Sequence, residues 1–320
     1  MRPYLVVGGC LLLAACGTAA PPPRTASDPA VPAGAEAISL FGQPLTPPEL
    51  PPEAQADREA KLAEARAALQ ARPDDPDALI WVGRRTAYLG RYREAIEIFG
   101  QGIARFPQDA RFIRHRGHRW ITVRQFDRAA EDLDKAARLV AGKPDEVEPD
   151  GLPNRYNIPT STLQSNIWYH LGLAHYLQGD FDKALHAYRE CLKVSNNPDM
   201  EVATRHWLYM TLRRLGREAE AAEILAPVRA DMKILENDAY HKLLLMYRGE
   251  MKPEALFRPA EGGDAIDPAT LGYGVANWHL YNGRRGEAVR ELQAVLATGQ
   301  WAAFGFIAAE ADLKRLGERP

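Results

Sequence analysis

Cysteines are few in this chain, and none of them has a metal-binding spacing. The 320 residues include only Cys10, Cys16 and Cys191, and no Cys-x-x-Cys pair occurs. Three cysteines are too few for a disulfide framework, and a zinc site needs several ligands at set spacings. We therefore predict no metal ion and no other cofactor.

Neither sign of charge is in excess. The chain has 40 Lys and Arg against 42 Asp and Glu, which gives a formal net charge of −2 at pH 7. Domains that bind nucleic acid concentrate a basic surplus on one surface, so we expect no nucleic-acid partner. Hydrophobic residues make up 46% of the chain, which is enough for a large core and excludes a disordered protein.

The sequence motifs of common enzyme classes are missing as well. The chain has no Gly-x-Ser-x-Gly, no phosphate-binding P-loop, and no Gly-x-Gly-x-x-Gly that follows a strand. Its carboxylates show no pairing that marks a general acid and a general base. We therefore predict no enzymatic activity and name no catalytic residue.

What the chain does have is a repeat of 34 residues. Gly83 and Gly117 lie at this distance, and so do Ala95 and Ala129. A period between 20 and 50 residues indicates stacked units, none of which buries its apolar face alone. The same spacing separates three further pairs, Tyr92 and Phe126, Phe99 and Leu133, and Pro73 and Pro107.

The pattern inside each repeat is helical. Residues 80–89 and 92–106 have helical periodicity and are separated by Gly90, and Pro107 follows the second stretch. This order predicts helix, turn, helix, turn. Residues 53–72 are rich in alanine, lack Gly and Pro, and predict one further helix before the repeats.

These positions resemble the signature of tetratricopeptide repeats. The small residues Gly83 and Ala95 let paired helices approach closely, while Tyr92 and Phe99 fill the space between neighbouring repeats. The resemblance extends over about residues 53–316. It implies an all-α fold, a right-handed α-solenoid of about six helix-turn-helix units with a C-terminal capping helix. The matching residues of the first unit are Leu79, Val82, Gly83, Gly90, Tyr92, Ala95, Phe99 and Pro107.

The phase of the repeat also gives the unit boundaries. Gly117 and Gly172 are 55 residues apart, one period plus 21, which places an insertion at about residues 142–162. The fifth unit is degenerate because Pro253, Pro259 and the Gly262-Gly263 pair shorten its second helix. Within a superhelix of residues 53–317, we expect units at about residues 76–109, 110–143, 165–198, 202–235, 236–268 and 269–302.

The N-terminal segment resembles the signal of bacterial lipoproteins. Arg2 precedes the apolar run of residues 4–13, which is too short to cross a membrane, and Leu13 to Cys16 resembles a lipobox. The resemblance implies removal of residues 1–15, acylation of Cys16 with palmitate or similar chains, and sorting by Gly17 to the outer membrane. We expect a lipid-anchored protein that faces the periplasm. The alternatives are a plain secretory signal and an internal start site.

Residues 16–52 are predicted to form a proline-rich tether after the lipidated cysteine. Prolines at ten positions between residues 21 and 52, including the run Pro21-Pro22-Pro23, exclude helix and sheet. Such a spacer is semi-extended and holds the repeats away from the lipid surface. The short apolar stretch of residues 38–41 either docks on the folded domain or is incidental.

In tetratricopeptide proteins the first helices of successive units line a concave groove. Residues one period apart then stack in rows, and the rows of this chain mix Arg, His and Tyr. Such a lining suits a ligand with carboxylate or phosphate groups, or an extended acidic peptide. Ordinary solvated helix faces are the alternative. We predict a partner-binding groove formed by Arg84, Tyr88, Arg114, His118, Tyr169 and His206.

Two histidines within this groove lie three residues apart on one helix. His115 and His118 can meet one ion or one phosphate, but a metal site needs a third ligand and the neighbouring arginines repel cations. We therefore predict no metal site. Contact with an anion or partner, and packing between repeats, remain the two interpretations of this pair.

The insertion is acidic and lies opposite this basic groove. It carries Asp145, Glu146, Glu148 and Asp150, followed by a glycine and two prolines. Long loops in compact proteins are often functional, so we hypothesise a lid or an internal mimic of the ligand. A plain solvated linker and a calcium site are the alternatives, although the spacing is not that of an EF-hand loop.

Together these features predict a membrane-anchored periplasmic adaptor or scaffold. It would bind partner proteins or peptides, acidic ones included, in the concave groove. Two alternatives belong to other classes. The first is a glycan- or peptidoglycan-binding lipoprotein that stacks sugars on Tyr88, Tyr169 and Tyr281. The second is a hydrolase whose histidine-rich groove is catalytic.

Overall fold

Helices make up nearly all the regular structure of the protein. The computed structural model describes residues 31–256 and 267–320, and Val31–Pro320 group into one compact unit. The predicted signal peptide, Cys16 and the first half of the tether lie outside the described residues. The helices are α1 (Pro52–Ala71), α2 (Pro76–Tyr88), α3 (Tyr92–Arg105), α4 (Ala110–Thr122), α5 (Phe126–Val140), α6 (Leu163–Gln178), α7 (Phe181–Val194), α8 (Pro198–Arg214), α9 (Glu218–Leu225), α10 (Asp238–Tyr247), α11 (Asp267–Tyr281), α12 (Arg285–Ala297) and α13 (Phe304–Leu316).

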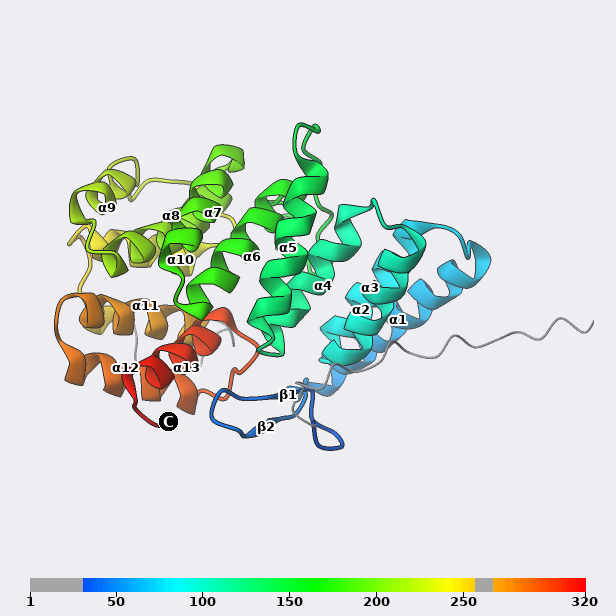
Figure 1. Cartoon of the computed structure of the whole chain (residues 1–320), viewed down its shortest axis with the longest axis horizontal. Helices are drawn as coiled ribbons and strands as arrows, with labels where there is room; N and C mark the ends of the chain where they lie inside the picture. The colour runs from blue at the N-terminus through cyan, green and yellow to red at the C-terminus, as the bar shows by residue number, and fades with distance from the viewer. Residues whose placement is uncertain (1–30, 257–266) are drawn as a thin grey trace, which may run out of the picture. The chain divides into compact units, whose positions relative to one another are not determined.

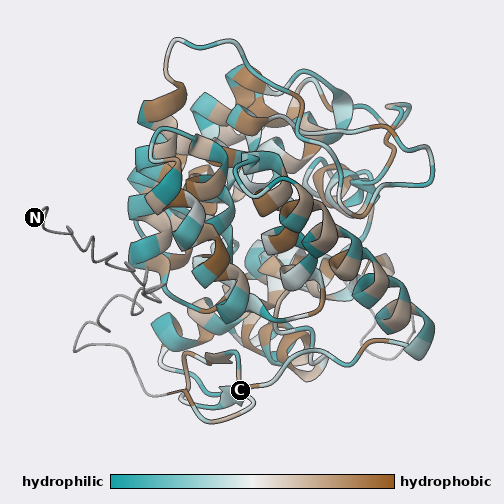
Figure 2. Cartoon of the chain, turned by 90° about the vertical axis from the view of Figure 1, so that its right-hand side faces the viewer, coloured by the Kyte–Doolittle hydropathy of each residue, from teal (hydrophilic) through white to brown (hydrophobic). Residues whose placement is uncertain are grey.

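Successive helices form antiparallel pairs, as the repeat predicts (Figure 1). The pairs are α2 with α3, α4 with α5, α6 with α7, α8 with α9, and α11 with α12. The first helices contact one another from α2 through α8 and form an inner layer, while α3, α5 and α7 lie outside them. Hydrophobic and hydrophilic residues alternate along the helices (Figure 2), as this packing requires. The predicted all-α solenoid is confirmed.

A glycine on the first helix of each of units one to three explains the close approach of its partner. A Cβ atom on Gly117 would lie 2.7 Å from Leu133, and one on Gly172 would lie 2.7 Å from the ring of Tyr188. Gly83 has the same relation to Phe99 in the unit before. Interiors are packed too densely to absorb an added methyl group at such distances. In these units the repeat therefore reflects the packing of a glycine on the first helix against a large side chain on the second.

The fifth unit departs from this pattern. Helix α10 is its first helix, and a 3-10 turn, η1 (Pro253–Ala255), follows where a second helix would begin. Pro259 and the Gly262-Gly263 pair lie outside the described residues. Over residues 31–256 and 267–320, we find no helix with the length and apolar character needed to span a bilayer.

The C-terminal helix does more than cap the last unit. Helix α13 packs against α11 and α12, as predicted, and also contacts α6 in the inner layer (Figure 1). Its Asp312 is fully buried and accepts hydrogen bonds from Arg214 at 3.0 Å and Tyr273 at 2.9 Å. The helix is therefore part of the core between the middle and last units.

A buried junction also joins α13 to the second unit. The Nε atom of Arg124 lies 3.0 Å from Oε2 of Glu310, and both side chains are 2% exposed. The Arg124 side chain also donates to the carbonyl of Trp301 at 2.8 Å. Arg124 has a φ of 65°, at a turn where other units have glycine. These bonds offset the strain of a left-handed arginine.

The prediction that the tether of residues 16–52 contains no sheet is wrong at residues 37–45. Strands β1 (Ala37–Ile38) and β2 (Pro44–Leu45) pair as an antiparallel hairpin. The hairpin docks on the junction, because Leu40 donates its N–H to Glu310 at 2.6 Å and Trp301 donates to the Thr46 carbonyl at 2.7 Å. Its prolines are tolerated because a two-stranded hairpin leaves half of its backbone groups unpaired. Residues 38–41 thus belong to a docked segment.

Candidate partner-binding site

The candidate site lies where the insertion crosses the inner faces of α2 and α4. The two arms of the insertion pair like short strands, with Glu148 donating to Ser161 at 3.1 Å and Leu163 donating to Glu146 at 2.8 Å. Thr162 then caps α6 through a capping box. The insertion therefore has a fixed base, from which the remainder extends toward α2.

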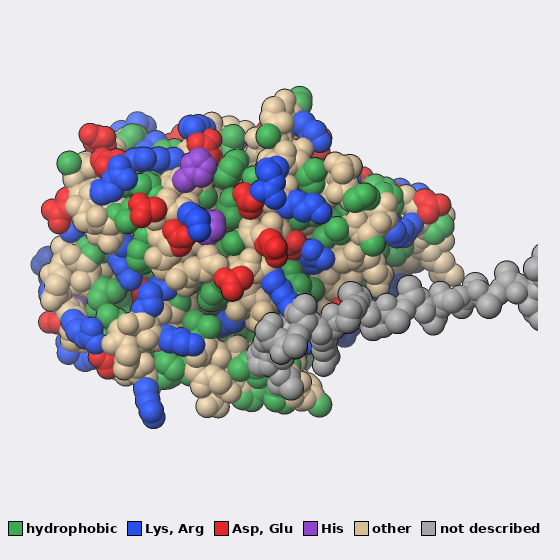
Figure 3. Space-filling view, in the orientation of Figure 1, with side chains coloured by type: hydrophobic (Ala, Val, Ile, Leu, Met, Phe, Trp, Pro, Cys, Tyr) green, Lys and Arg blue, Asp and Glu red, His purple; other side chains and the backbone are tan. Residues whose placement is uncertain are grey.

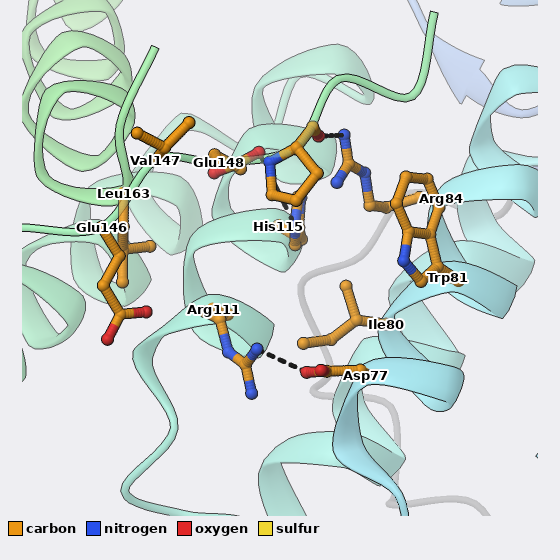
Figure 4. Close-up of a pocket in the computed structure, with 11 residues that line it drawn as sticks. Asp77, Ile80, Trp81, Arg84, Arg111, His115, Glu146, Val147, Glu148 and Leu163 are labelled. Carbon is orange, nitrogen blue, oxygen red and sulfur yellow. Dashed lines mark hydrogen bonds and ion pairs between the residues drawn. The ribbon is translucent and has the colours of Figure 1, made fainter. Parts of the chain in front are cut away.

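Three arginines of the inner layer hold the insertion. Arg84 donates to the carbonyl of Pro149 at 2.7 Å, and Arg85 donates to the carbonyl of Gly151 at 2.7 Å. Arg114 forms an ion pair with Glu148 at 3.1 Å. Figure 4 shows Arg84 and Glu148 near His115, with the Arg84 bond dashed. An extended acidic segment thus already lies on the predicted basic residues.

Aromatic rings hold these arginines in place. The guanidinium groups of Arg84 and Arg85 lie 4.4 Å and 4.8 Å from the centre of the Trp81 ring. Such stacking favours a cation and fixes its plane. Arg114 donates to Nδ1 of His115 at 2.9 Å, and the His115 ring stacks on Phe99 at 5.3 Å. Contacts within α2, α3 and α4 therefore help to position these arginines, in addition to their contacts with the insertion.

Gly151 is required by the contact with α2. A Cβ atom at this position would lie 2.5 Å from two ring carbons of Tyr88. Real Cβ atoms do not approach other atoms so closely, so a larger residue here would displace either the insertion or the tyrosine. Sequence reasoning gave Gly151, Arg85 and Trp81 no role in binding. A glycine directly after four acidic residues was the available signal for the first of them.

The contact between insertion and groove leaves polar atoms unmatched. Among the described residues, Arg114 Nε, Glu148 Oε2 and Asp150 Oδ2 are buried without a hydrogen-bond partner. Each such atom costs about 1–3 kcal/mol relative to a satisfied one. Burial, followed by the nearby Glu236, raises the pKa of the Asp150 carboxyl. The insertion is thus held by strong bonds but fits the face imperfectly.

The face beneath the insertion has a surplus of cationic groups. Arg84, Arg114 and Arg119 approach one another, and burial lowers the pKa of Arg119 to about 10. Burial also lowers the pKa of His115 and of His118 well below the ordinary histidine value, so both rings are neutral at pH 7. Glu148 is the carboxylate that pairs with Arg114. This electrostatic environment favours an anionic ligand.

A cavity of about 210 Å³ opens beside this contact (Figure 4). Its walls are apolar on one side and charged on the other, where Arg111 pairs with Asp77 at 2.6 Å. The volume suits one medium-sized side chain of a partner. The lining residues are Asp77, Ile80, Trp81, Arg84, Arg111, His115, Glu146, Val147, Glu148, Pro149 and Leu163.

The exposed apolar side chains of the protein gather on the same insertion. In the part of the chain that the structure describes, the large hydrophobic residues that remain exposed all lie there. Isolated exposed apolar residues are ordinary, but a group on one loop indicates an interaction surface. We call this group the apolar rim. It comprises Val147 (63% exposed), Leu152 (51%), Tyr156 (49%) and Ile158 (50%).

The other predicted groove residues do not line an open surface. The ring of Phe304 on α13 lies 5.3 Å from His118 and 6.4 Å from Tyr169. Tyr169 donates its hydroxyl to Tyr240 at 3.1 Å, and His206 is 1% exposed. The predicted groove does not continue here, because α13 packs against the inner layer and covers these residues. Packing between repeats is thus the role of His118, whose ring lies 4.2 Å from that of His170.

The remaining acidic residues of the insertion have local roles. Asp145 accepts a hydrogen bond from the backbone of Gln164 at 3.0 Å, at the start of α6. Glu146 lines the cavity. Asp150 lies near Arg84 but makes no hydrogen bond through Oδ2 within the described residues. The lid hypothesis therefore depends on Glu148 and on the backbone that follows it.

The glycan and hydrolase alternatives gain no support from the geometry. Tyr169 is 7% exposed and Tyr88 lies under Gly151, so neither offers a free ring face to a sugar. Over residues 31–256 and 267–320, no three His, Cys, Asp or Glu residues come together as metal ligands. On the face in Figure 3, acidic and basic side chains are interspersed, without the basic surface of a nucleic-acid-binding protein.

Comparison with known proteins identifies the repeat. The family described as tetratricopeptide repeat matches residues 165–198, which form the helix pair α6 and α7. Residues 165–198 of this chain thus match a tetratricopeptide repeat. The match falls on the third unit that the sequence predicts, with the same boundaries. The candidate site lies in the two units before it.

Known relatives are distant. The protein is 26% identical to the BBSome complex member BBS4 of Bos taurus over 140 residues. The aligned region covers 44% of this chain and 23% of BBS4. Among solved structures, YrrB, described as a tetratricopeptide protein with an unusual peptide-binding site, has a TM-score of 0.41 at 13% identity. The alignment covers 73% of this chain and 91% of YrrB. MamA also has a TM-score of 0.41, at 15% identity over 62% and 95% of the two chains.

Proposed function

We propose that this protein is a lipid-anchored periplasmic adaptor that binds an extended acidic segment of a partner protein on the face formed by α2 and α4. One observation carries the proposal. Arg84 and Arg85 bind two backbone carbonyls of an extended segment, and Arg114 binds its carboxylate. Backbone carbonyls are common to every peptide, while the carboxylate adds selectivity for acidic ones. Solenoids of helix pairs commonly present such surfaces to partners.

The membrane anchor in this proposal rests on the resemblance of residues 13–16 to a lipobox. Acylation of Cys16 would hold the protein at the outer membrane, since several acyl chains on one residue anchor a protein firmly. Because residues 37–46 pair and dock at the junction, the tether in this proposal ends before the hairpin.

The anchor is tested by fractionation of cells that express Cys16→Ala. We expect the native protein in the outer-membrane fraction and a larger share of the variant, with its signal uncleaved or its lipid missing, in other fractions. Metabolic labelling with a palmitate analogue provides an independent readout. Equal labelling of native protein and variant would show that Cys16 is not the lipidated residue.

Partner binding is tested by cross-linking and affinity capture from membranes. Arg84→Glu with Arg114→Glu should remove the captured protein partners, because a face that repels carboxylates replaces one that binds them. The matched control reverses two exposed charges, Arg138→Glu and Lys183→Glu, and should leave capture unchanged. Circular dichroism confirms that each variant is folded. Equal capture by all three proteins would refute the proposed face.

A further inference from the structure

We propose that residues 148–151 are an internal ligand of the partner-binding face, which a partner segment of the same chemistry must displace. The inference rests on the proposed function, because it names the ligand class and the regulation of that face. The ligand is an extended segment with an acidic residue followed three positions later by glycine, Glu-x-x-Gly. In this chain the two positions are Glu148 and Gly151.

The contacts of this segment are those of a bound peptide. Two of them use backbone carbonyls, which any extended peptide presents, and the third uses a carboxylate. They join residues 65 and 66 positions apart in the sequence. The repeat itself needs no such bridge, since α4, α5 and α6 pack directly on one another. The segment therefore occupies the face without being required to build it.

Two positions of the segment are selected by the face. The residue at 148 must carry a negative charge, because its Oε1 lies 3.1 Å from Arg114 and 3.8 Å from His115 Nε2. The residue at 151 must be glycine, because Tyr88 leaves no room for a Cβ atom. The residues between them contribute mainly backbone. This spacing is the basis of the Glu-x-x-Gly rule.

The unmatched atoms make the segment displaceable. Arg114 Nε and Glu148 Oε2 are buried without partners at the centre of the contact, within the part of the chain described. A partner segment with a better placed donor and acceptor would satisfy both, which the internal ligand does not. An internal ligand is present at a high effective concentration, on the order of millimolar. An imperfect fit keeps such a ligand from excluding partners altogether.

The attachment points of the insertion define what moves. Its base is fixed by the bonds between Glu148 and Ser161 and between Glu146 and Leu163. Its tip is held at Glu236, which accepts hydrogen bonds from Asn154 at 3.0 Å and from Thr160. Displacement thus requires release of residues 149–159 and of the Glu148 side chain. Three residues of the apolar rim lie within this stretch, and they give the partner additional contacts that a short peptide lacks.

A labelled peptide with the sequence of residues 145–153 tests the internal ligand. It is titrated against the full chain and against full chains with Glu148→Gln, with Gly151→Ala, and with both. Each substitution weakens the internal contact and leaves the groove intact. We expect the double variant to bind the peptide at least tenfold more tightly than the native chain, as loss of a charge-assisted bond implies.

The matched control is Glu146→Gln, which removes the same charge two residues away. Glu146 lines the cavity and takes no part in the contacts that hold residues 148–151, so peptide affinity should equal that of the native protein. A peptide with Gln and Ala at the two selected positions should bind the double variant at least tenfold more weakly. Equal binding of both peptides, or of both proteins, would overturn the inference.

Limited trypsin digestion gives a second readout that needs no peptide. Arg155 lies in the exposed tip of the insertion. Cleavage after Arg155 should be at least several-fold faster in Gly151→Ala than in the native chain, and unchanged in Glu146→Gln. Unchanged cleavage in Gly151→Ala would show that the insertion stays bound and would contradict the proposal, provided that circular dichroism shows a native helix content.

The two proposals fail in different ways. If affinity capture loses its partners on charge reversal of Arg84 and Arg114, while the peptide binds native and double-variant chains alike, the face binds partners and the insertion is not its internal ligand. If the peptide binds the double variant as expected but capture is unaffected by charge reversal, the internal contact is exchangeable and the cellular partner binds elsewhere.

Discussion

The inner layer of the solenoid is covered in two ways, and the two covers differ in chemistry. Over α2 and α4, the insertion makes contacts through carbonyls and one carboxylate, and leaves buried polar atoms unmatched. Over α6 and α11, helix α13 brings Phe304 against aromatic rings and places Asp312 within a network of hydrogen bonds. The first cover is therefore suited to exchange, whereas the second is part of the core.

The largest expected effect tests the α13 cover. Asp312→Ala removes the fully buried carboxylate that pairs with the largely buried Arg214, which costs about 3–5 kcal/mol in the free energy of unfolding. Urea denaturation measures the loss. Asp231→Ala is the control, since its pair with Arg229 is exposed and contributes about 0–1 kcal/mol. Similar losses in both variants would show that α13 is not an integral part of the core.

The stability of the helical core and the docking of the insertion should respond to acid in opposite directions. Burial lowers the pKa of His206 to about 3, and burial lowers the pKa of His170 well below the ordinary value. Below about pH 6.5 these histidines take up protons in the unfolded chain but stay neutral in the folded one. The free energy of unfolding therefore falls as pH falls. The slope approaches roughly 1.4 kcal/mol per pH unit for each histidine. Urea denaturation at pH 7 and pH 5 measures it, and His206→Phe should reduce the difference.

The insertion should become more firmly docked as the Asp150 carboxyl takes up a proton. The pKa of Asp150 is raised by burial and by Glu236 and Glu148, and Arg84 opposes them. A carboxyl with a raised pKa disfavours docking when charged, so docking strengthens as pH falls through that pKa. Asp150→Asn should slow tryptic cleavage at Arg155 a few-fold at pH 7 and remove the pH dependence. Faster cleavage in this variant would contradict the conclusion that the charge of Asp150 opposes docking.

The smallest effect on stability concerns the apolar rim. Leu152→Ser with Ile158→Ser should change the free energy of unfolding by less than about 0.5 kcal/mol, since both side chains are half exposed. Partner capture should nevertheless weaken, because exposed apolar side chains are contact area for a partner. Unchanged capture would limit the binding site to the arginine face.

The sequence predicts those parts of the fold that local spacing controls. The glycines at 83, 117 and 172 recur in phase because each faces a large residue of its own unit. The break in phase located the insertion, and its charge indicated a contact with Arg84 and Arg114. Arg85 and Trp81 were missed because the predicted groove included Arg84 and Tyr88 of this helix but not the residues beside them. Their role depends on where the insertion crosses α2, which no local pattern records.

Contacts between segments far apart in the sequence could not be predicted from the sequence. The capping role of α13 follows from its place after the last unit, but its contact with α6 depends on the curvature of all the units between them. The hairpin at residues 37–45 was misread because proline content describes local preference only. Its stability comes from Glu310 and Trp301, which lie more than 250 residues away in sequence.

That hairpin determines how mechanical load would enter the protein. Tension on the N-terminal segment reaches the hairpin before it reaches α1. It is therefore borne first by the bonds from Leu40 to Glu310 and from Trp301 to Thr46, at the junction with the C-terminal helix. If Cys16 is anchored as we propose, a pull on the N-terminal segment would be transmitted through these two bonds to Glu310 and Trp301.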